Sequence, residues 1–435
     1  MILVRFSAME TFQRVFFTIL LLFTVVNALS PNPRNGHWVD TWTSMPQLTE
    51  STNLPPVPFT QPTVVFQNAT IRQTLHLSTG ANQIRLRISN AFGTTDLPIT
   101  AATIALPLNG TAGASAIIPS TLQTITFSGN SSIDIPNGAL VVSDPIAMQV
   151  KPQSMITVTL YLAQGQVSND ITSHPGSRTT SWFSAGNHLS AADVSTISGT
   201  MSAEHWFFLS AVEAWSPPST RSFVVVGDSI TDGRGSTTNE NDRWPDQLLT
   251  RMQANPRTSD IAVVNQAAGG NRILLDGLGP NALGRIERDV LSQSGVAYVM
   301  IFEGVNDIGT STASNVSIVG DQVIQAYKQI ITRVHTMGLP MFAATITPFF
   351  GNAYFTDPNE ATRQRINNWI RSSGFFDAVV DFDAAIRDPT NPQRINPTFD
   401  SGDGLHPNPA GYKTMANVFD LALFEKFSSG VSSFQ

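Results

Sequence analysis

Cysteine is absent from the 435 residues of this chain. Disulfide bonds and thiolate-bound metals are therefore excluded, and burial of a hydrophobic core has to hold the fold together. Basic residues are also few, because Lys and Arg number 25 against 32 Asp and Glu, and they form no run. The formal net charge of −7 argues against a nucleic-acid partner and gives no sign of an electrostatic membrane contact.

Long hydrophobic runs are equally scarce. One short run, residues 15–26, follows two arginines and precedes small residues. It is shorter than the ~20 residues that span a bilayer comfortably, and Val26 and Ala28 suit the −3 and −1 positions of a signal-peptidase site. We predict a signal peptide over residues 1–28, secretion to the extracellular space, and no stable membrane anchor after cleavage.

The predicted secretion bears on two further features, the start of translation and the glycosylation sites. The segment from Met9 onward is complete as a signal by itself, so translation can begin at Met1 or at Met9. The candidate glycosylation sites of this predicted eukaryotic secretory protein are the Asn-x-Ser/Thr sequences at Asn68, Asn109, Asn130 and Asn315. A fifth such sequence, at Asn396, is excluded by the proline that follows it.

The N-terminal half, residues 29–215, alternates apolar and polar residues. In residues 83–89 and 155–162 every second side chain is aliphatic, which is typical of strands with one buried face. Gly, Asn and Pro turns separate several such strands, and this spacing predicts an all-β sandwich, jelly-roll-like. Residues 216–221, with two prolines, form the expected linker.

Two roles remain open for this β-rich domain. It can be a structural or positioning module. Alternatively, its aromatic side chains, for instance Trp38, Trp42 or Trp182, contact a polysaccharide or roof an active site. Because Trp is as often a core residue, none of the three is assigned.

The C-terminal half, residues 222–435, alternates short apolar runs with helical patterns. Such alternation indicates βαβ units and a parallel sheet. It predicts a flavodoxin-like three-layer α/β/α domain. The expected strands are residues 223–227, 261–265, 298–302, 340–345 and 378–382, and the expected helices are residues 245–253, 283–291, 320–337, 360–371 and 409–427.

Ser229 follows the first of these strands and the turn-forming Gly227 and Asp228. It therefore lies at the carboxyl end of a central strand, where open α/β sheets bind ligands. A plain helix cap is the alternative for this serine. Far downstream, Asp403 precedes His406 by three residues in a Gly/Pro-rich loop. Among the histidines only His406 has this arrangement, so the pattern favours Ser229 as the nucleophile of an ester hydrolase.

Two further strand ends carry hydrogen-bond donors. Gly269 and Gly270 follow the second strand, where glycine lets a backbone N–H approach a substrate oxygen closely. Asn306 follows the third strand and offers an amide donor that carries no titratable proton. Both are what an oxyanion hole requires.

Four blocks of the sequence, in order, resemble the GDSL/SGNH hydrolase superfamily. They are residues 227–231 (with Ile where the family name has Leu), 265–270, 304–307 and 403–407. The resemblance implies Ser229 as nucleophile, His406 as general base and Asp403 as the residue that orients it. It also implies an oxyanion hole of the Ser229 and Gly270 N–H groups and the Asn306 side chain.

Within the superfamily, residues 243–248 and 277–283 resemble secreted xylan-esterase-like proteins with a β-rich N-terminal domain. The sequence thus predicts a cofactor-free serine esterase, with deacetylation of plant polysaccharide such as xylan preferred. A lipase or a general short-chain acyl esterase is the alternative substrate class. The alternative from another class is a non-catalytic carbohydrate-binding protein.

Two other hydrolase classes fit less well. The sequence around Ser229 is not G-x-S-x-G, and Asp403 and His406 share one loop, which disfavours an α/β-hydrolase. Asp228, Asp232 and Asp307 could suggest a metal-dependent phosphoesterase. No histidine accompanies them in the strand-end loops, so no metal is predicted.

Overall fold

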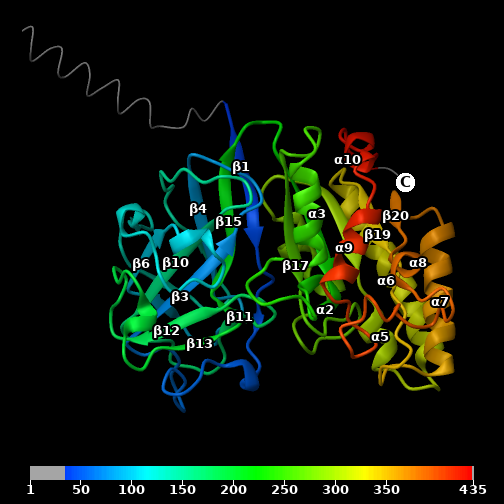
Figure 1. Cartoon of the computed structure of the whole chain (residues 1–435), viewed down its shortest axis with the longest axis horizontal. Coiled ribbons are helices and arrows are strands. Elements are labelled where there is room, and N and C mark those ends of the chain that lie inside the picture. The colour runs from blue at the N-terminus through cyan, green and yellow to red at the C-terminus, as the bar shows by residue number, and fades with distance from the viewer. Residues whose placement is uncertain (1–34, 434–435) are drawn as a thin grey trace, which may run out of the picture.

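The computed structural model describes residues 35–433 and has two halves that lie side by side (Figure 1). The predicted signal peptide and its cleavage site lie outside the described residues. The N-terminal half is built mainly of strands, with a few short 3-10 helices, and ends with β15 at Ser216. The C-terminal half begins with β16 at Arg221 and alternates strands with helices.

Short antiparallel strands build the N-terminal half. Two sheets, ordered β1-β15-β4-β9 and β13-β12-β3-β10-β6-β7, share one hydrophobic core. Smaller sheets β14-β11-β2 and β5-β8 complete it. The strands are β1 (His37–Thr43), β2 (Gln47–Leu48), β3 (Ala69–His76), β4 (Ile84–Ser89), β5 (Leu97–Ile99), β6 (Ala101–Ala105), β7 (Gln123–Ile125), β8 (Ile133–Ile135), β9 (Leu140–Val142), β10 (Met155–Leu162), β11 (Thr172–His174), β12 (Ser181–Ala185), β13 (Met201–Ala203), β14 (Trp206–Phe207) and β15 (Leu209–Ser216).

The period-two pattern of this half is visible in β4. Ile84, Leu86 and Ile88 are fully buried in the sandwich core, whereas Arg85 and Arg87 point to the opposite face. There both guanidinium groups pair with the buried carboxylate of Glu213 on the neighbouring β15. A jelly-roll arrangement of these strands stays a prediction.

The C-terminal half contains one parallel sheet. Its strand order, β17-β16-β18-β19-β20, places the first strand of the domain second from the edge, as in flavodoxin-like sheets. All four pairings are parallel. The strands are β16 (Arg221–Gly227), β17 (Ile261–Ala267), β18 (Val296–Phe302), β19 (Met341–Ala344) and β20 (Ala378–Val380).

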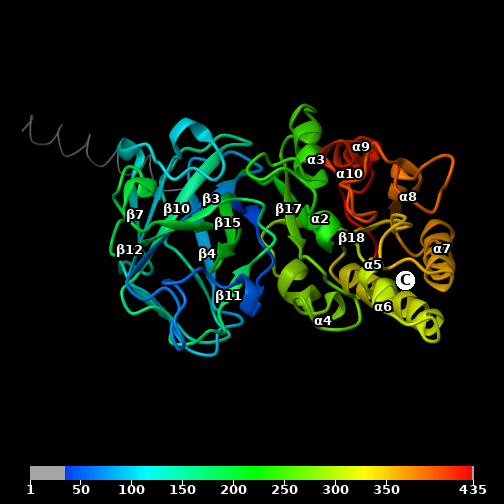
Figure 2. The ribbon, with the colours of Figure 1, turned by 60° about the horizontal axis from the view of Figure 1, so that its bottom comes forward.

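Helices cover both faces of this sheet, as predicted. One face carries α3, α9 and α10, and the other carries α4, α6 and α7 (Figure 2). The helices are α2 (Ser229–Asp232), α3 (Trp244–Gln253), α4 (Ala282–Ile286), α5 (Val305–Gly309), α6 (Val316–Thr336), α7 (Asp357–Ser372), α8 (Phe382–Ile386), α9 (Pro409–Val418) and α10 (Ala422–Lys426).

Two predicted helices differ in detail. The expected helix over residues 409–427 is two helices, because Phe419 takes an extended conformation (φ −69°, ψ 120°) and ends α9. The expected helix over residues 283–291 changes from α-helix to a π-helical turn, Glu287–Leu291.

The two halves meet where β1 lies along β17, the edge strand of the parallel sheet. Two backbone carbonyls of this edge accept hydrogen bonds from the N-terminal half. Ser78 Oγ donates to Val263 O at 2.7 Å and Thr43 Oγ1 donates to Asn265 O at 3.0 Å. Because unpaired strand edges are open to pairing with other chains, the β-rich half covers a vulnerable surface.

Candidate active site

Ser229 lies at the first residue of α2, directly after β16. The carboxylate of Asp228 caps this short helix by accepting the Ile230 N–H at 2.9 Å. Gly227 is required for the tight turn, since a Cβ there would come within 2.4 Å of Thr231 Oγ1. The turn holds Ser229 at the carboxyl end of the sheet, and its side chain is nearly buried, with 7% of the residue exposed.

His406 and Asp403 reach Ser229 from the loop before α9. Ser229 Oγ lies 2.8 Å from His406 Nε2, and His406 Nδ1 lies 2.6 Å from Asp403 Oδ2. The other carboxylate oxygen of Asp403 accepts the N–H groups of Leu405 and His406 at 3.0 and 2.9 Å. The backbone of the loop thus holds the Asp403 carboxylate in place, and the carboxylate in turn orients the imidazole ring of His406.

The electrostatics of this chain favour a neutral imidazole. Burial lowers the pKa of His406, and the guanidinium groups of Arg234 and Arg178 lower it further, while Asp403 opposes them. Burial alone would raise the pKa of Asp403, but hydrogen bonds from His406 bring it below its usual value. Because the ionised Asp403 can only accept, Nδ1 of His406 carries the proton and Nε2 is free to accept one from Ser229.

The predicted oxyanion donors lie around the same serine. Gly270 has a φ of +71°, a conformation that favours glycine, and with Ser229 and Asn306 it lines one cavity. Asn306 is held by two hydrogen bonds, from its Nδ2 to Asn271 O at 2.8 Å and from Tyr354 OH to its Oδ1 at 3.1 Å. The amide nitrogen has a second hydrogen that remains for a ligand.

A buried arginine that the sequence did not single out joins the strand ends beneath the site. Arg285 on α4 donates to Gly227 O, Gln266 O and Asn271 Oδ1. It also pairs with the buried carboxylate of Glu303 at 3.5 Å. Burial and the neighbouring Asp228 raise the pKa of Glu303 well above its ordinary value. Arg285 thus holds the segments that carry Ser229, Gly270 and Asn306 in a fixed relation.

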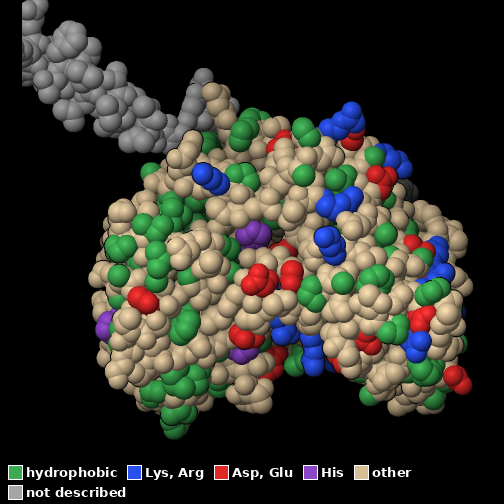
Figure 3. All heavy atoms as spheres, viewed as in Figure 1, with side chains coloured by type: hydrophobic (Ala, Val, Ile, Leu, Met, Phe, Trp, Pro, Cys, Tyr) green, Lys and Arg blue, Asp and Glu red, His purple; other side chains and the backbone are tan. Residues whose placement is uncertain are grey.

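The cavity above Ser229 has a volume of about 610 Å³ and lies where the two halves meet. Charged side chains of both signs line the boundary between the halves (Figure 3). The C-terminal half contributes Arg234, Leu278, Asn352 and Tyr354 besides the residues above. The N-terminal half contributes Gln47, Glu50, Asn53, Pro175, Gly176, Arg178, Glu204 and His205.

The sequence contains no signal for this second wall of the cavity, because nothing in a β-rich pattern marks which loops face a neighbouring domain. Of the aromatics named as roof candidates, none lines the cavity. Trp42 is buried with 6% exposure, its ring against Trp206, and Trp182 donates its indole N–H to Gly113 O. Trp38 packs edge-on against Trp215. The β-rich half therefore roofs the site with polar loops and not with these tryptophans.

His335 in α6 is buried, with only 3% of it exposed. Its Nε2 lies 2.8 Å from Asp377, whose carboxylate also accepts the Met341 N–H. The helical pattern could not reveal this partner, which lies outside α6.

The three aspartates that could suggest a metal have other partners. Asp228 caps α2, and Asp307 accepts the N–H groups of Ile273 and Leu274. Asp232 does have a histidine partner, His174, which comes from the β-rich half. Residues 35–433 contain no group of three or more His, Asp or Glu side chains arranged to hold a metal ion.

Part of the chain is similar to known proteins. The family model of GDSL-like lipase/acylhydrolases matches residues 223–419. The C-terminal half is thus a GDSL-like lipase/acylhydrolase domain, and the enzyme is a carboxylic ester hydrolase. No curated protein matches the chain.

Solved structures resemble a part of this chain. An acetylxylan esterase from Geobacillus stearothermophilus is 20% identical and matches over 46% of this chain and 92% of its own, with a TM-score of 0.36. A GDSL-like lipase from Bacteroides thetaiotaomicron is 16% identical over 47% of this chain and 89% of its own, with a TM-score of 0.34.

The structure gives the exposure of the predicted glycosylation sites and the character of the helices. All four candidate glycosylation residues, Asn68, Asn109, Asn130 and Asn315, are exposed. Within residues 35–433, no helix combines the length and the apolar character needed to cross a membrane.

Proposed function

We propose that Ser229, His406 and Asp403 form the catalytic triad of a secreted serine esterase that works through an acyl-enzyme. The observation that carries this proposal is the continuous hydrogen-bond chain from Ser229 Oγ through His406 to Asp403 at the floor of a cavity. A serine hydroxyl is a weak nucleophile unless a base takes its proton, and the neutral imidazole provides that base.

In the first half-reaction Ser229 Oγ bonds to the ester carbonyl carbon while its proton moves to His406 Nε2. The carbonyl oxygen becomes an oxyanion, which accepts hydrogen bonds from the N–H groups of Ser229 and Gly270 and from Asn306 Nδ2. The intermediate collapses when the C–O bond to the alcohol breaks and His406 returns the proton to the leaving oxygen. Asp403 stabilises the transient imidazolium.

In the second half-reaction a water molecule attacks the acyl-enzyme. His406 accepts the water's proton and then gives it to Ser229 Oγ as the carboxylic acid leaves. The same residues act in both half-reactions. His406 therefore serves first as base and then as acid in each of them.

For the substrate we propose acetylated plant cell-wall polysaccharide such as xylan. The polar loops of the β-rich half, including Gln47, Asn53 and Arg178, support an alcohol portion rich in hydroxyl groups. Leu278 fills the space beside Gly270, since a Cβ on that glycine would come within 2.4 Å of its Cδ1. That occupied space supports a short acyl group over a long one. A general short-chain esterase is the second candidate.

A series of aryl esters of increasing acyl length, assayed beside acetate release from acetylated xylan, tests the substrate. Acetate release with a preference for two-carbon acyl groups supports the proposal, whereas a preference for long chains indicates a lipase. Labelling of Ser229 by a fluorophosphonate tests the mechanism, and its absence would indicate a non-catalytic binding protein. A secreted protein that begins directly after Ala28 would support the predicted secretion.

A further inference from the structure

A buried hydrogen bond between His174 and Asp232 crosses the boundary between the halves. His174 on β11 belongs to the β-rich half, and Asp232 on α2 follows Ser229 by three residues. His174 Nε2 lies 2.8 Å from Asp232 Oδ1. Only 4% of His174 and 5% of Asp232 is exposed, so water screens this contact little.

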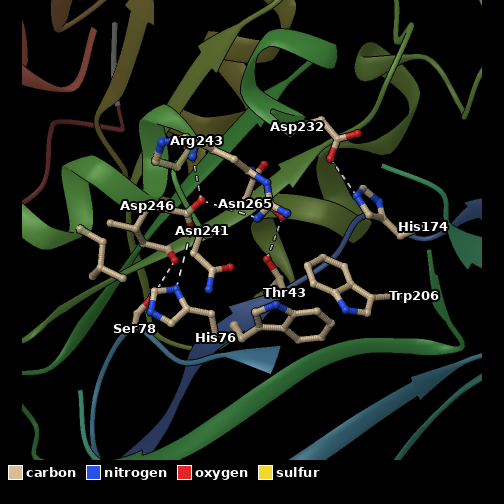
Figure 4. A pocket seen from close by; sticks show the side chains of 14 residues that line it. Thr43, His76, Ser78, His174, Trp206, Asp232, Asn241, Arg243, Asp246 and Asn265 are labelled. Carbon is tan, nitrogen blue, oxygen red and sulfur yellow. Dashed lines mark hydrogen bonds and ion pairs between the residues drawn. The ribbon is translucent and has the colours of Figure 1, made fainter. Parts of the chain in front are cut away.

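The pair has a defined orientation. His174 Nδ1 lies 3.0 Å from the carbonyl oxygen of Met45, which can only accept, so Nδ1 donates. The ring is also stacked on Trp206, with centroids 5.8 Å apart. Figure 4 shows His174 pointing toward Asp232 at one side of a small cavity of about 40 Å³ between the halves. The ring therefore presents one fixed nitrogen to the carboxylate.

The second oxygen of Asp232 faces the catalytic loop. Asp232 Oδ2 accepts the N–H of Gly269 at 3.0 Å. Gly269 is bonded directly to Gly270, whose N–H is the proposed oxyanion donor. A carboxylate that anchors the Gly269 amide restricts the direction of the Gly270 amide, because only the φ and ψ angles of Gly269 separate the two groups. The chain His174–Asp232–Gly269 thus runs from the β-rich half to Gly270.

The loop after His174 confirms how closely the two halves approach here. A Cβ on Gly176 would come within 1.6 Å of Asp232 Oδ2, so only glycine lets this loop pass. At this point the loop approaches the Asp232 carboxylate, which also binds His174 across the boundary and Gly269 beside the oxyanion hole.

We propose that His174 is a positioning residue for the esterase, which orients the oxyanion hole through Asp232 and Gly269. The inference rests on the proposed function. It makes the β-rich half a part of the catalytic apparatus, because the active site is complete only when His174 is in place.

The test compares His174→Phe, which keeps an aromatic ring without a nitrogen donor, with Asp232→Ala and Asp232→Asn. Asparagine can still accept the Gly269 N–H and can donate to a neutral His174, so it keeps both bonds. We expect kcat on a chromogenic acetate to fall at least about tenfold in the first two variants, toward the ~10²–10³ of a lost oxyanion donor. KM should stay within about twofold, and Asp232→Asn should keep most of the activity.

A transition-state readout separates positioning from structure. Inhibition by phenylboronic acid, which forms a tetrahedral adduct with a catalytic serine, should weaken in parallel with kcat/KM in His174→Phe. His188, which bonds Ala185 O in the same half and does not line the cavity, provides the matched control His188→Phe. The control should match the native enzyme, and thermal unfolding should show that each variant is folded.

Two results would overturn the proposal. One is a folded His174→Phe with native kcat and native boronate inhibition. The other is an Asp232→Asn as defective as Asp232→Ala, because then the hydrogen bonds are not what matters. If the native protein and His188→Phe hydrolyse no ester and Ser229 takes no fluorophosphonate label, the proposed function itself has failed.

Discussion

His406 Nε2 lies 2.8 Å from Ser229 Oγ, although the two residues are 177 positions apart in the chain. This contact brings the first and last blocks of the catalytic half into one site. The distance is that of a hydrogen bond that can pass a proton without rearrangement of either side chain.

Replacing either member of this pair should remove most activity. In Ser229→Ala and His406→Ala we expect turnover of a chromogenic acetate to fall by roughly 10⁴-fold or more, because no activated nucleophile remains. Ser236→Ala is the matched control, since that hydroxyl bonds only Gly233 O in the following turn. A folded variant with native turnover would contradict the assignment.

Asn306 should affect the transition state more than substrate binding. Asn306→Ala removes one oxyanion donor, and kcat should fall by ~10²–10³ with little change in KM. Tyr354→Phe removes only the hydroxyl that orients Asn306 Oδ1, so its loss should be smaller. Steady-state kinetics of the two variants give this order, and the reverse order would argue against the role of Asn306.

The pH profile should report the two arginines near His406. In the proposed mechanism neutral His406 is the active form, so kcat/KM should rise as pH passes its pKa. Burial, Arg234 and Arg178 lower that pKa, which extends activity to lower pH. Arg178→Gln removes a positive charge and should therefore shift the acid limb of the profile to higher pH. The shift should shrink at high salt, because Arg178 is only partly buried and lines the cavity, where salt screens its charge. An unmoved acid limb would show that Arg178 does not act on the histidine.

Asp40 in β1 offers a test of stability at the boundary between the halves. Its carboxylate accepts the Ser294 N–H at 2.7 Å, and burial raises its pKa to about 7. Between the unfolded value, near ~3.9, and about 7, the folded state holds a proton that the unfolded state has released. This group therefore makes the protein less stable as pH rises through that window.

Asp40→Asn mimics the protonated carboxyl and removes this penalty. We expect the variant to unfold with nearly native free energy near pH 4, and to be more stable than the native protein near pH 8 by roughly 1–4 kcal/mol. Urea unfolding at both pH values measures the difference. An equal effect at the two pH values would show that Asp40 does not titrate in this way.

The sequence was sufficient to predict the features that depend on neighbouring residues in the chain. The apolar runs before Ser229 and Asn306 predicted the strands that the structure contains, because buried parallel strands are continuous hydrophobic runs. Asp403 and His406 could be paired from their spacing alone, since a three-residue separation within one loop keeps them in reach. The resemblance to the GDSL/SGNH superfamily then joined blocks that local patterns could not connect.

What the sequence did not reveal depends on how the two halves dock. His174 and Arg178 lie in a β-rich stretch whose alternation marks the buried face but not the neighbour of each loop. In the sequence, Arg285 is only a basic residue within a helical pattern. Its contacts with the strand ends cannot be predicted without the order of the strands in the sheet. Long-range contacts of this kind carry no periodic signal in the chain.

The hydroxyl groups of Ser78 and Thr43 on the edge of β17 have a consequence for biosynthesis. Synthesis proceeds from the N-terminus, so the sandwich that carries both hydroxyls leaves the ribosome before β17 does. The cover thus exists before the edge that it protects. A permuted chain that made the hydrolase half first would present its bare carbonyl edge to other nascent chains, and its yield of soluble enzyme should fall even though every native contact could still form.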